Sequence, residues 1–294
     1  MQNLTVAVIG PAGYAGHLGK KGTVSDITFY NQKRDHTTVT YVEPSRYPER
    51  ISSLFYTVSM ADMALLVVDE ITPAFGECVL MLDAAGVREG VLVLRNYLSP
   101  DQVVPLVRDT VVGNYALQPD DHNLLRETFL EIAGARGAPG GEGKHGAVPV
   151  DHCFPVKGVG TVVLGTVARG TVRVHDELRV FPANRAAHVR SIQKHDDDVP
   201  SASAGDRVGL ALKGIEADGI DRGDVLSNDP SLVVSGIHHG RAELVRYWPA
   251  PLREQMVVHL GHWMQFVPAR VAYVNNSGDW RRPEVTFRSE RDLV

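Results

Sequence analysis

Hydrophobic positions follow different patterns before and after residue 135. In the first part, short continuous apolar runs lie at 4–9, 64–68 and 91–94. Continuous runs of this length are typical of parallel strands that are buried on both faces. Residues 75–85 have helical character between two of these runs, and Gly86 is a plausible helix stop. Alternation of strands and helices predicts a doubly wound α/β sheet.

The end of this first domain is predicted from a helix and a linker. Asp120 and Asp121 precede a one-sided apolar face that runs to Ile132, which is typical of a helix start. The stretch 136–146 is rich in glycine and contains proline, so it cannot bury enough apolar surface to order itself. We therefore predict an α/β domain over 1–135 and a linker over 136–146.

Beyond the linker, the pattern changes to short strands punctuated by glycines. Strands at this spacing are typical of β-barrels, and a second break lies at Asn228-Asp229-Pro230. The predicted domains are therefore a β-barrel over 147–228 and a further β-domain over 229–294. Gly158 and Gly165 stand among β-branched neighbours, where the strand path is expected to turn sharply.

A set of blocks in the predicted barrel carries a family resemblance. In chain order these blocks are GVGTVVLG, VHDEL, RSIQ, AGDRVGLAL and RGDVLS, all within 158–227. Together they resemble the second domain of the translational GTPases, meaning elongation factor Tu and the selenocysteine-specific elongation factor. Residues 256–261 and 266–271 are similar to the third domain of that family. The resemblance implies a P-loop-GTPase-like doubly wound domain followed by two β-barrels, the last of which is short: either incomplete or truncated.

The family's phosphate loop, G-x-x-x-x-G-K-[ST], is degenerate in this chain. Residues 10–17 read GPAGYAGH, so Ala15 takes the place of the second glycine, Gly16 that of the lysine and His17 that of the magnesium-binding hydroxyl. Lys20 comes too late for the register. An ordinary strand-to-helix turn is the competing interpretation of the glycines, although such a turn still attracts anions. The vestigial nucleotide-binding residues of this loop are Gly10, Gly13, Gly16 and Lys20.

The family's D-x-P-G-H element is degenerate as well. Aligned on Pro44, which is retained, Val42 replaces the aspartate, Ser45 the glycine and Arg46 the histidine. Glu43 is adjacent, but on a strand its side chain is expected on the face opposite to that of Val42.

The guanine-binding N-K-x-D element retains only Asn96, since Tyr97 replaces its lysine and Ser99 its aspartate. With these elements lost together, the contacts that stabilise phosphoryl transfer are missing. We therefore expect no catalytic residues, no metal site and no GTP, GDP or Mg²⁺ as cofactor, and we expect that the chain is not an enzyme.

Composition limits the class of protein further. The chain has 294 residues, 44% hydrophobic and 22% charged, and a net charge of −5, as in an ordinary soluble globular protein. No signal peptide or membrane-spanning run is visible, and the two cysteines have no metal-like spacing. A cytoplasmic location without membrane partners is therefore expected.

A net negative charge argues against general coating of nucleic acid but leaves room for a local basic surface. Scattered solubilising charge is the competing interpretation of the basic residues, while Trp280 is expected to be exposed and able to stack on a base. The candidate RNA contacts are Arg190, Lys194, Arg270, Trp280, Arg281 and Arg282.

The leading hypothesis is an elongation-factor-like pseudo-GTPase. In the family that it resembles, the second domain, with the first, forms the aminoacyl pocket and the third contacts the tRNA stem, so tRNA, the ribosome or another translation factor are the implied partners. One alternative is an authentic GTP-binding elongation factor with an unorthodox phosphate loop. A second is a protein-interaction scaffold that does not bind RNA.

Overall fold

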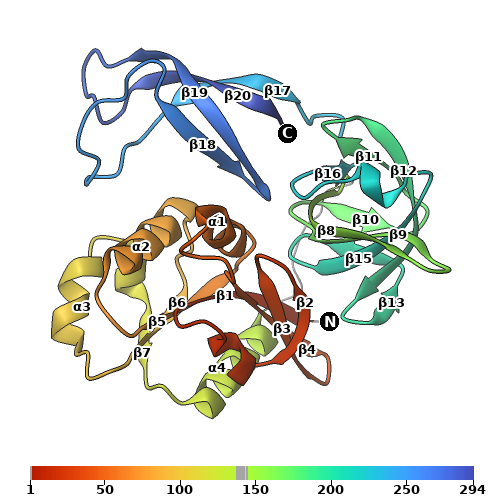
Figure 1. Ribbon diagram of the computed structural model, residues 1–294. Coiled ribbons are helices and arrows are strands. Elements are labelled where there is room, and N and C mark those ends of the chain that lie inside the picture. Colours follow the sequence, from red (N-terminus) through yellow and green to blue (C-terminus); the bar gives the residue numbers. More distant parts are fainter. Residues whose placement is uncertain (1, 137–142, 144) are drawn as a thin grey trace. The chain divides into compact units, whose positions relative to one another are not determined.

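The computed structural model describes residues 2–136, 143 and 145–294, and the chain divides into compact units at residues 140 and 141 (Figure 1). Each unit is described by itself. Most of the predicted linker, 137–142 and 144, lies outside the described residues. Within them, no helix is both long and apolar enough to cross a membrane.

In residues 2–136, the first unit contains a seven-stranded sheet of order β2-β3-β4-β1-β5-β6-β7. Strands β4, β1, β5, β6 and β7 are parallel, whereas β2 and β3 form an antiparallel extension at one edge. Its strands are β1 (Gln2–Ile9), β2 (Lys20–Val24), β3 (Thr28–Arg34), β4 (Thr37–Glu43), β5 (Met63–Val68), β6 (Gly90–Leu94) and β7 (Ala116–Gln118). Its helices are η1 (Tyr14–His17), α1 (Ile51–Ser59), α2 (Pro73–Ala85), α3 (Pro100–Val107), η2 (Val111–Asn114) and α4 (His122–Ala135).

Helices cover both faces of this sheet, as the sequence predicts. Leu4, Val6 and Val8 of β1 pack with α4 on one face, whereas Ala7 and Ile9 pack with α1, α2 and α3 on the other. Successive strand residues point to opposite faces, so a strand covered on both sides is apolar throughout. The runs at 4–9, 64–68 and 91–94 are confirmed as buried parallel strands.

Helix boundaries follow local capping chemistry. The Thr72 hydroxyl accepts a hydrogen bond from the Phe75 N–H at the start of α2, and Gly86 ends that helix in the left-handed region at φ 70°. The Asp121 carboxylate caps α4 by accepting from the amides of Asn123 and Leu124. The sequence predicts the end of α2 at Gly86 and the start of α4 at Asp120-Asp121, but not the Thr72 cap.

The strand-to-helix turn that was the competing interpretation of the glycines after β1 does not lead into an α-helix. Residues 14–17 form only the short 3-10 helix η1, and the chain then enters β2 at Lys20. Glycines at 16, 19 and 22 disfavour a continued α-helix, since each costs about 1 kcal/mol relative to alanine in a helix interior.

In residues 145–294, the second unit contains a closed β-barrel and an open sheet. The barrel strands follow the order β11-β16-β8-β9-β15-β12, and β11 pairs back to β12 to close it. The edge strand β13 pairs with β12, and β10 pairs with β14 in a separate ribbon. The strands are β8 (Ala147–Val156), β9 (Gly160–Thr166), β10 (Thr171–Arg173), β11 (Glu177–Phe181), β12 (Arg185–Lys194), β13 (Asp197–Val199), β14 (Ser201–Ser203), β15 (Arg207–Lys213) and β16 (Val225–Ser227), with the 3-10 helix η3 (Ala217–Gly219).

The last part of the chain departs from a barrel. In the described residues 229–294, β17 (Ser235–Arg241), β18 (Val257–His262), β19 (Gln265–Asn275) and β20 (Glu284–Leu293) form a four-stranded sheet of order β17-β20-β19-β18. The edge strands β17 and β18 do not pair in this part of the structure, so the sheet stays open (blue strands in Figure 1). The second barrel expected from the family resemblance is therefore incomplete in these residues, and Leu252, Val271 and Val285 form a small buried core there.

Candidate functional site

The carboxyl edge of the first sheet holds a pocket. The next parallel strand after β1 is β4 on one side, which the chain reaches through β2 and β3, whereas the next after β5 is β6 on the other side. Open α/β sheets bind ligands outside the carboxyl ends of their strands at such a switch point. The pocket here has a volume of about 310 Å³ and is lined by the ends of β1, β4 and β5 and the first turns of α2.

A carboxylate of the chain itself binds the first loop in this pocket. Glu43, the last residue of β4, is 6% exposed. Its Oε1 accepts a hydrogen bond of 2.5 Å from the Gly13 N–H, and its Oε2 accepts one of 3.0 Å from the Ala15 N–H. Gly13 adopts φ 83°, a conformation that glycine permits without strain. Two amides of the degenerate phosphate loop are therefore already bonded to an anion.

Glu43 is the residue that the sequence analysis missed. Its position on a strand next to Val42 was noted, but the direction of its side chain was inferred only relative to Val42. Two features of the sequence point to Glu43. It is a charged residue at the end of an apolar strand, and the glycine-rich loop of the same chain lacks its lysine. Burial and the negative charge of Glu43 together raise the pKa of Tyr30 nearby.

The other residues of the loop lie in different surroundings. Gly10 packs against β5, where an added Cβ would lie 2.7 Å from Val67 Cβ, so close packing alone accounts for this glycine. The His17 imidazole stacks on that of His122 in α4, with ring centroids 4.4 Å apart and planes 2° from parallel. Gly16 is exposed in η1, and Lys20 is exposed at the start of the edge strand β2.

Polar side chains from the loops after β5, β6 and β7 bind one another and the Tyr14 hydroxyl. The Arg95 guanidinium lies 3.0 Å from Asp120 and 3.4 Å from Asp69, and the Tyr14 hydroxyl donates to Asp120 at 2.6 Å. Burial and the adjacent Asp120 raise the pKa of Tyr14. Asn96, in the left-handed region at φ 50°, donates to the Asp69 carbonyl at 3.5 Å. This network joins the loops that follow β5, β6 and β7, and the loop after β6 contains the degenerate guanine-binding element.

The residues present do not fit a magnesium nucleotide. The pocket is lined by the carboxylates of Glu43, Asp69 and Glu70, and no lysine, arginine or histidine is among its lining residues. Pro44, the retained residue of the second element, lines it too. A phosphate group would meet like charge at amides that are already bonded, so no step of GTP hydrolysis follows from this geometry. In the part of the chain that the structure describes, no three His, Cys, Asp or Glu side chains are grouped to hold a metal ion.

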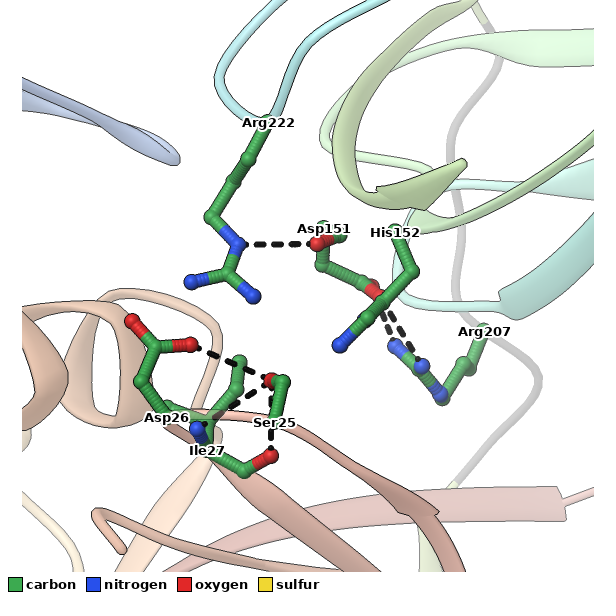
Figure 2. A network of polar contacts seen from close by, with 7 residues as sticks. All are labelled: Ser25, Asp26, Ile27, Asp151, His152, Arg207 and Arg222. Atoms are coloured by element: carbon green, nitrogen blue, oxygen red, sulfur yellow. Dashed lines mark hydrogen bonds and ion pairs between the residues drawn. The ribbon is translucent and has the colours of Figure 1, made fainter. Parts of the chain in front are cut away.

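A second polar network lies in the barrel and joins Asp151, His152, Arg207 and Arg222 (Figure 2). The buried Asp151 carboxylate pairs with the Arg207 guanidinium at 2.5 and 3.2 Å and lies 2.7 Å from His152 Nδ1. The Arg222 Nε donates to the Asp151 carbonyl at 2.9 Å. Burial alone would raise the pKa of Asp151, but Arg207 and the hydrogen bond from His152 lower it to about 2. This network fixes an ionised carboxylate inside the unit.

The predicted RNA contacts lie on different elements: Arg190 and Lys194 on β12, Arg270 on β19, and 280–282 between β19 and β20. Lys194 stays an untested candidate; its side chain is 15% exposed, and its ammonium forms an ion pair with the buried Asp206. Arg190 is exposed and donates to the Val159 carbonyl at 3.2 Å. Arg270 is exposed on β19.

The three candidate RNA contacts that follow β19 also make contacts within the protein. Trp280 is half-buried rather than exposed, because the Arg281 guanidinium covers its ring at 4.4 Å. Arg281 also donates to the Val245 carbonyl at 3.1 Å, and Arg282 pairs with Glu243 at 2.8 Å. Both arginines thus hold the segment between β17 and β18 as well as presenting charge.

Arg270 has a partner that the sequence analysis did not identify. It lies directly opposite Arg288 of β20 in the antiparallel ladder, and both residues are exposed. Directly opposed residues of a ladder share a face, so two positive charges lie side by side on the open sheet. Such a pair is unfavourable for the sheet and favourable for binding a phosphate backbone.

A segment of the second unit matches a known protein family. Residues 160–227 match the family model described as Elongation factor Tu domain 2. That range covers most of the closed barrel from β9 to β16.

Similarity to known proteins extends over most of the chain. An uncharacterised protein of Methanocaldococcus jannaschii is 46% identical over 78% of this chain and 73% of its own length. The selenocysteine-specific elongation factor of the same organism is 30% identical over 86% of this chain, which spans 58% of that relative. Translation elongation factor SelB from Methanococcus maripaludis, solved in complex with the GTP analogue GppNHp, is 25% identical with a TM-score of 0.84 and covers all of this chain and 73% of its own.

Proposed function

Because the chain belongs to the translational GTPase family, we propose that it is an elongation-factor-like protein that binds RNA of the translation apparatus without a GTP cycle. The partner is tRNA, the ribosome or a complex that contains one of them. This function places the protein in the cytoplasm, where translation takes place.

The half of the proposal that concerns nucleotide rests on the first loop. Glu43 occupies the Gly13 and Ala15 amides, and the pocket around them is acidic. Phosphoryl transfer depends almost entirely on positioning and charge stabilisation by the protein. An acidic pocket without a lysine supplies neither, which supports binding and release that are not timed by hydrolysis.

The half that concerns RNA rests on the Arg270–Arg288 pair. Its two guanidinium groups stand on neighbouring strands of an open sheet, flanked by Val257 of β18 and Ile237 of β17 in the same ladder row. Val257 and Ile237 are 58% and 46% exposed. Arginine forks bind phosphate oxygens with paired hydrogen bonds, and apolar flanks suit contact with riboses and bases.

The RNA half is tested with fluorescently labelled tRNA in a polarisation assay at several salt concentrations. We expect Arg270→Gln and Arg288→Gln each to weaken binding several-fold and to reduce the salt slope by about 0.7–0.9, the value for one phosphate contact. Arg179→Gln, an exposed arginine of β11 in the barrel, is the matched control and leaves both quantities unchanged. Binding that is absent, or insensitive to salt and to both variants, contradicts RNA recognition and favours a protein-interaction scaffold.

The nucleotide half is tested by thermal unfolding of the unmodified protein with and without magnesium GTP. A ligand at a hundred times its Kd stabilises the folded state by about 2.7 kcal/mol, which is a readily measured rise in Tm. We expect no rise. A saturable, magnesium-dependent rise supports instead an authentic GTP-binding elongation factor.

A further inference from the structure

We propose that Glu43 is a tethered oxyanion that fills the chain's own anion site and makes the switch-point pocket selective against anionic ligands. The inference rests on the proposed function in one respect: it explains how the first unit keeps an ordered first loop without nucleotide.

The contacts are those of an anion in a backbone cradle. Each carboxylate oxygen of Glu43 accepts from a different amide, Gly13 at 2.5 Å and Ala15 at 3.0 Å. Hydrogen bonds to an ionised acceptor are about twice as strong as bonds between neutral groups. Ala15 and Glu43 are both buried, so loss of the carboxylate would leave the Ala15 N–H without an acceptor, whereas Gly13 is exposed.

Glu43 also connects the first loop to the segment that follows β4. Next to it, the Ser45 hydroxyl lies 2.5 Å from that of Thr28, and the Arg46 N–H donates to the Ser53 hydroxyl in α1 at 3.3 Å. The Ser53 hydroxyl in turn donates to the Asp26 carbonyl at 2.6 Å. The first loop, the end of β4, the β2–β3 turn and α1 thereby form one hydrogen-bonded network without a ligand.

The charge of Glu43 determines which ligands the pocket admits. Asp69 and Glu70 line the same pocket, so an incoming phosphate or carboxylate meets negative charge on more than one side. Removing the Glu43 side chain would free the amides and lower that charge at once. A small oxyanion from solution could then take the place of the missing carboxylate.

The experiment is chemical rescue of Glu43→Ala, followed by thermal unfolding and by the backbone amide resonances of Gly13 and Ala15. We expect a Tm several degrees below that of the unmodified protein. Sodium acetate or inorganic phosphate, compared with sodium chloride at equal ionic strength, restores part of the difference and shifts both resonances saturably. Glu70→Ala, which removes an exposed carboxylate from the same pocket, is the matched control and shows neither a comparable loss nor rescue.

Glu43→Gln keeps the test decisive if Glu43→Ala does not fold. The amide retains one acceptor oxygen but no charge, so both resonances are expected to move from their positions in the unmodified protein. Unchanged resonances in the variants, or equal effects of chloride, acetate and phosphate on Glu43→Ala, would overturn the inference. GTP binding by the unmodified protein, in contrast, would overturn the proposed function and the selectivity of the pocket against anions, while the rescue result would still support Glu43 as the acceptor of the Gly13 and Ala15 amides.

Discussion

At the scale of single residues, two glycines of the barrel are needed for different physical reasons. Gly158 adopts φ 80° in the turn between β8 and β9, and an added Cβ would meet nothing within 4 Å. Gly165 has no positive φ, but its added Cβ would lie 2.4 Å from the Pro149 carbonyl oxygen. Backbone strain therefore governs the first position and steric overlap the second.

Substitution of these glycines by alanine should separate the two effects. We expect Gly158→Ala to cost about 1–2 kcal/mol, the cost of the left-handed conformation for an L-residue, and Gly165→Ala to cost more, because backbone must move. Gly209→Ala is the control, since its Cβ would lie at an ordinary 3.5 Å from Leu164. Urea unfolding measures all three, and equal midpoints for Gly165→Ala and the control would show that β8 and β9 are not packed as described.

Asp151 gives the barrel a defined acid sensitivity. Its folded pKa of about 2 lies below the ordinary value of 3.8, so its stabilisation is fully present above about pH 4 and is lost as pH falls through 2. The difference corresponds to about 2 kcal/mol. Asp151→Asn should lower stability at neutral pH, because Arg207 loses its ion pair with a buried carboxylate.

The measurement for Asp151 is urea unfolding between pH 5 and pH 2. We expect the free energy of unfolding of Asp151→Asn to fall less steeply with acid than that of the unmodified protein. Parallel curves would mean that Asp151 is not held ionised by Arg207 and His152.

At the scale of elements, the open sheet contains an unfavourable pairing in β19 and β20. Arg270 and Arg288 face each other across the ladder, and like charges in this position are destabilising by some tenths of a kcal/mol. Arg288→Thr should therefore stabilise the sheet slightly, because it removes the repulsion and adds a residue that favours strands.

The same substitution should weaken tRNA binding several-fold, so stability and affinity change in opposite directions. Thermal unfolding and polarisation measured on one preparation test this. A variant that loses stability together with affinity would indicate that Arg288 has a structural role in the sheet.

At the scale of the whole molecule, restoring the signature residues of the phosphate loop should not restore a GTPase. Gly16→Lys with His17→Thr supplies a lysine and a hydroxyl, but Glu43 still occupies the loop amides, and Val42 and Ser99 still replace aspartates of the family pattern. Lost contacts of this kind cost about 3–4 kcal/mol of transition-state stabilisation each. We expect phosphate release no faster than that of free GTP, for the unmodified protein and for the double variant, with ribosomes present or absent.

This outcome is checked by release of labelled phosphate over hours, with a Gly10→Val variant as the control for a contaminating GTPase. Saturable, magnesium-dependent release by the unmodified protein that Gly10→Val abolishes would contradict the pseudo-GTPase hypothesis.

The local elements of this molecule could be predicted because each depends on neighbours in the chain. The buried strands appear as unbroken apolar runs, and α2 and α4 begin at residues that cap them through bonds two or three positions away. Glycine-punctuated blocks likewise indicated the barrel over residues that match the family model. Burial pattern and capping are short-range effects, so they are readable along the sequence.

The candidate site, in contrast, depends on contacts between distant residues. Glu43 meets amides 30 and 28 positions away, Arg207 meets Asp151 across 56, and Arg288 meets Arg270 through the register of two strands. The sequence by itself determined that the phosphate loop lacks its lysine and its magnesium-binding hydroxyl. Only the tertiary structure decided that a carboxylate fills the vacated place, because sheet order and strand ends, not local pattern, bring β4 and the first loop together.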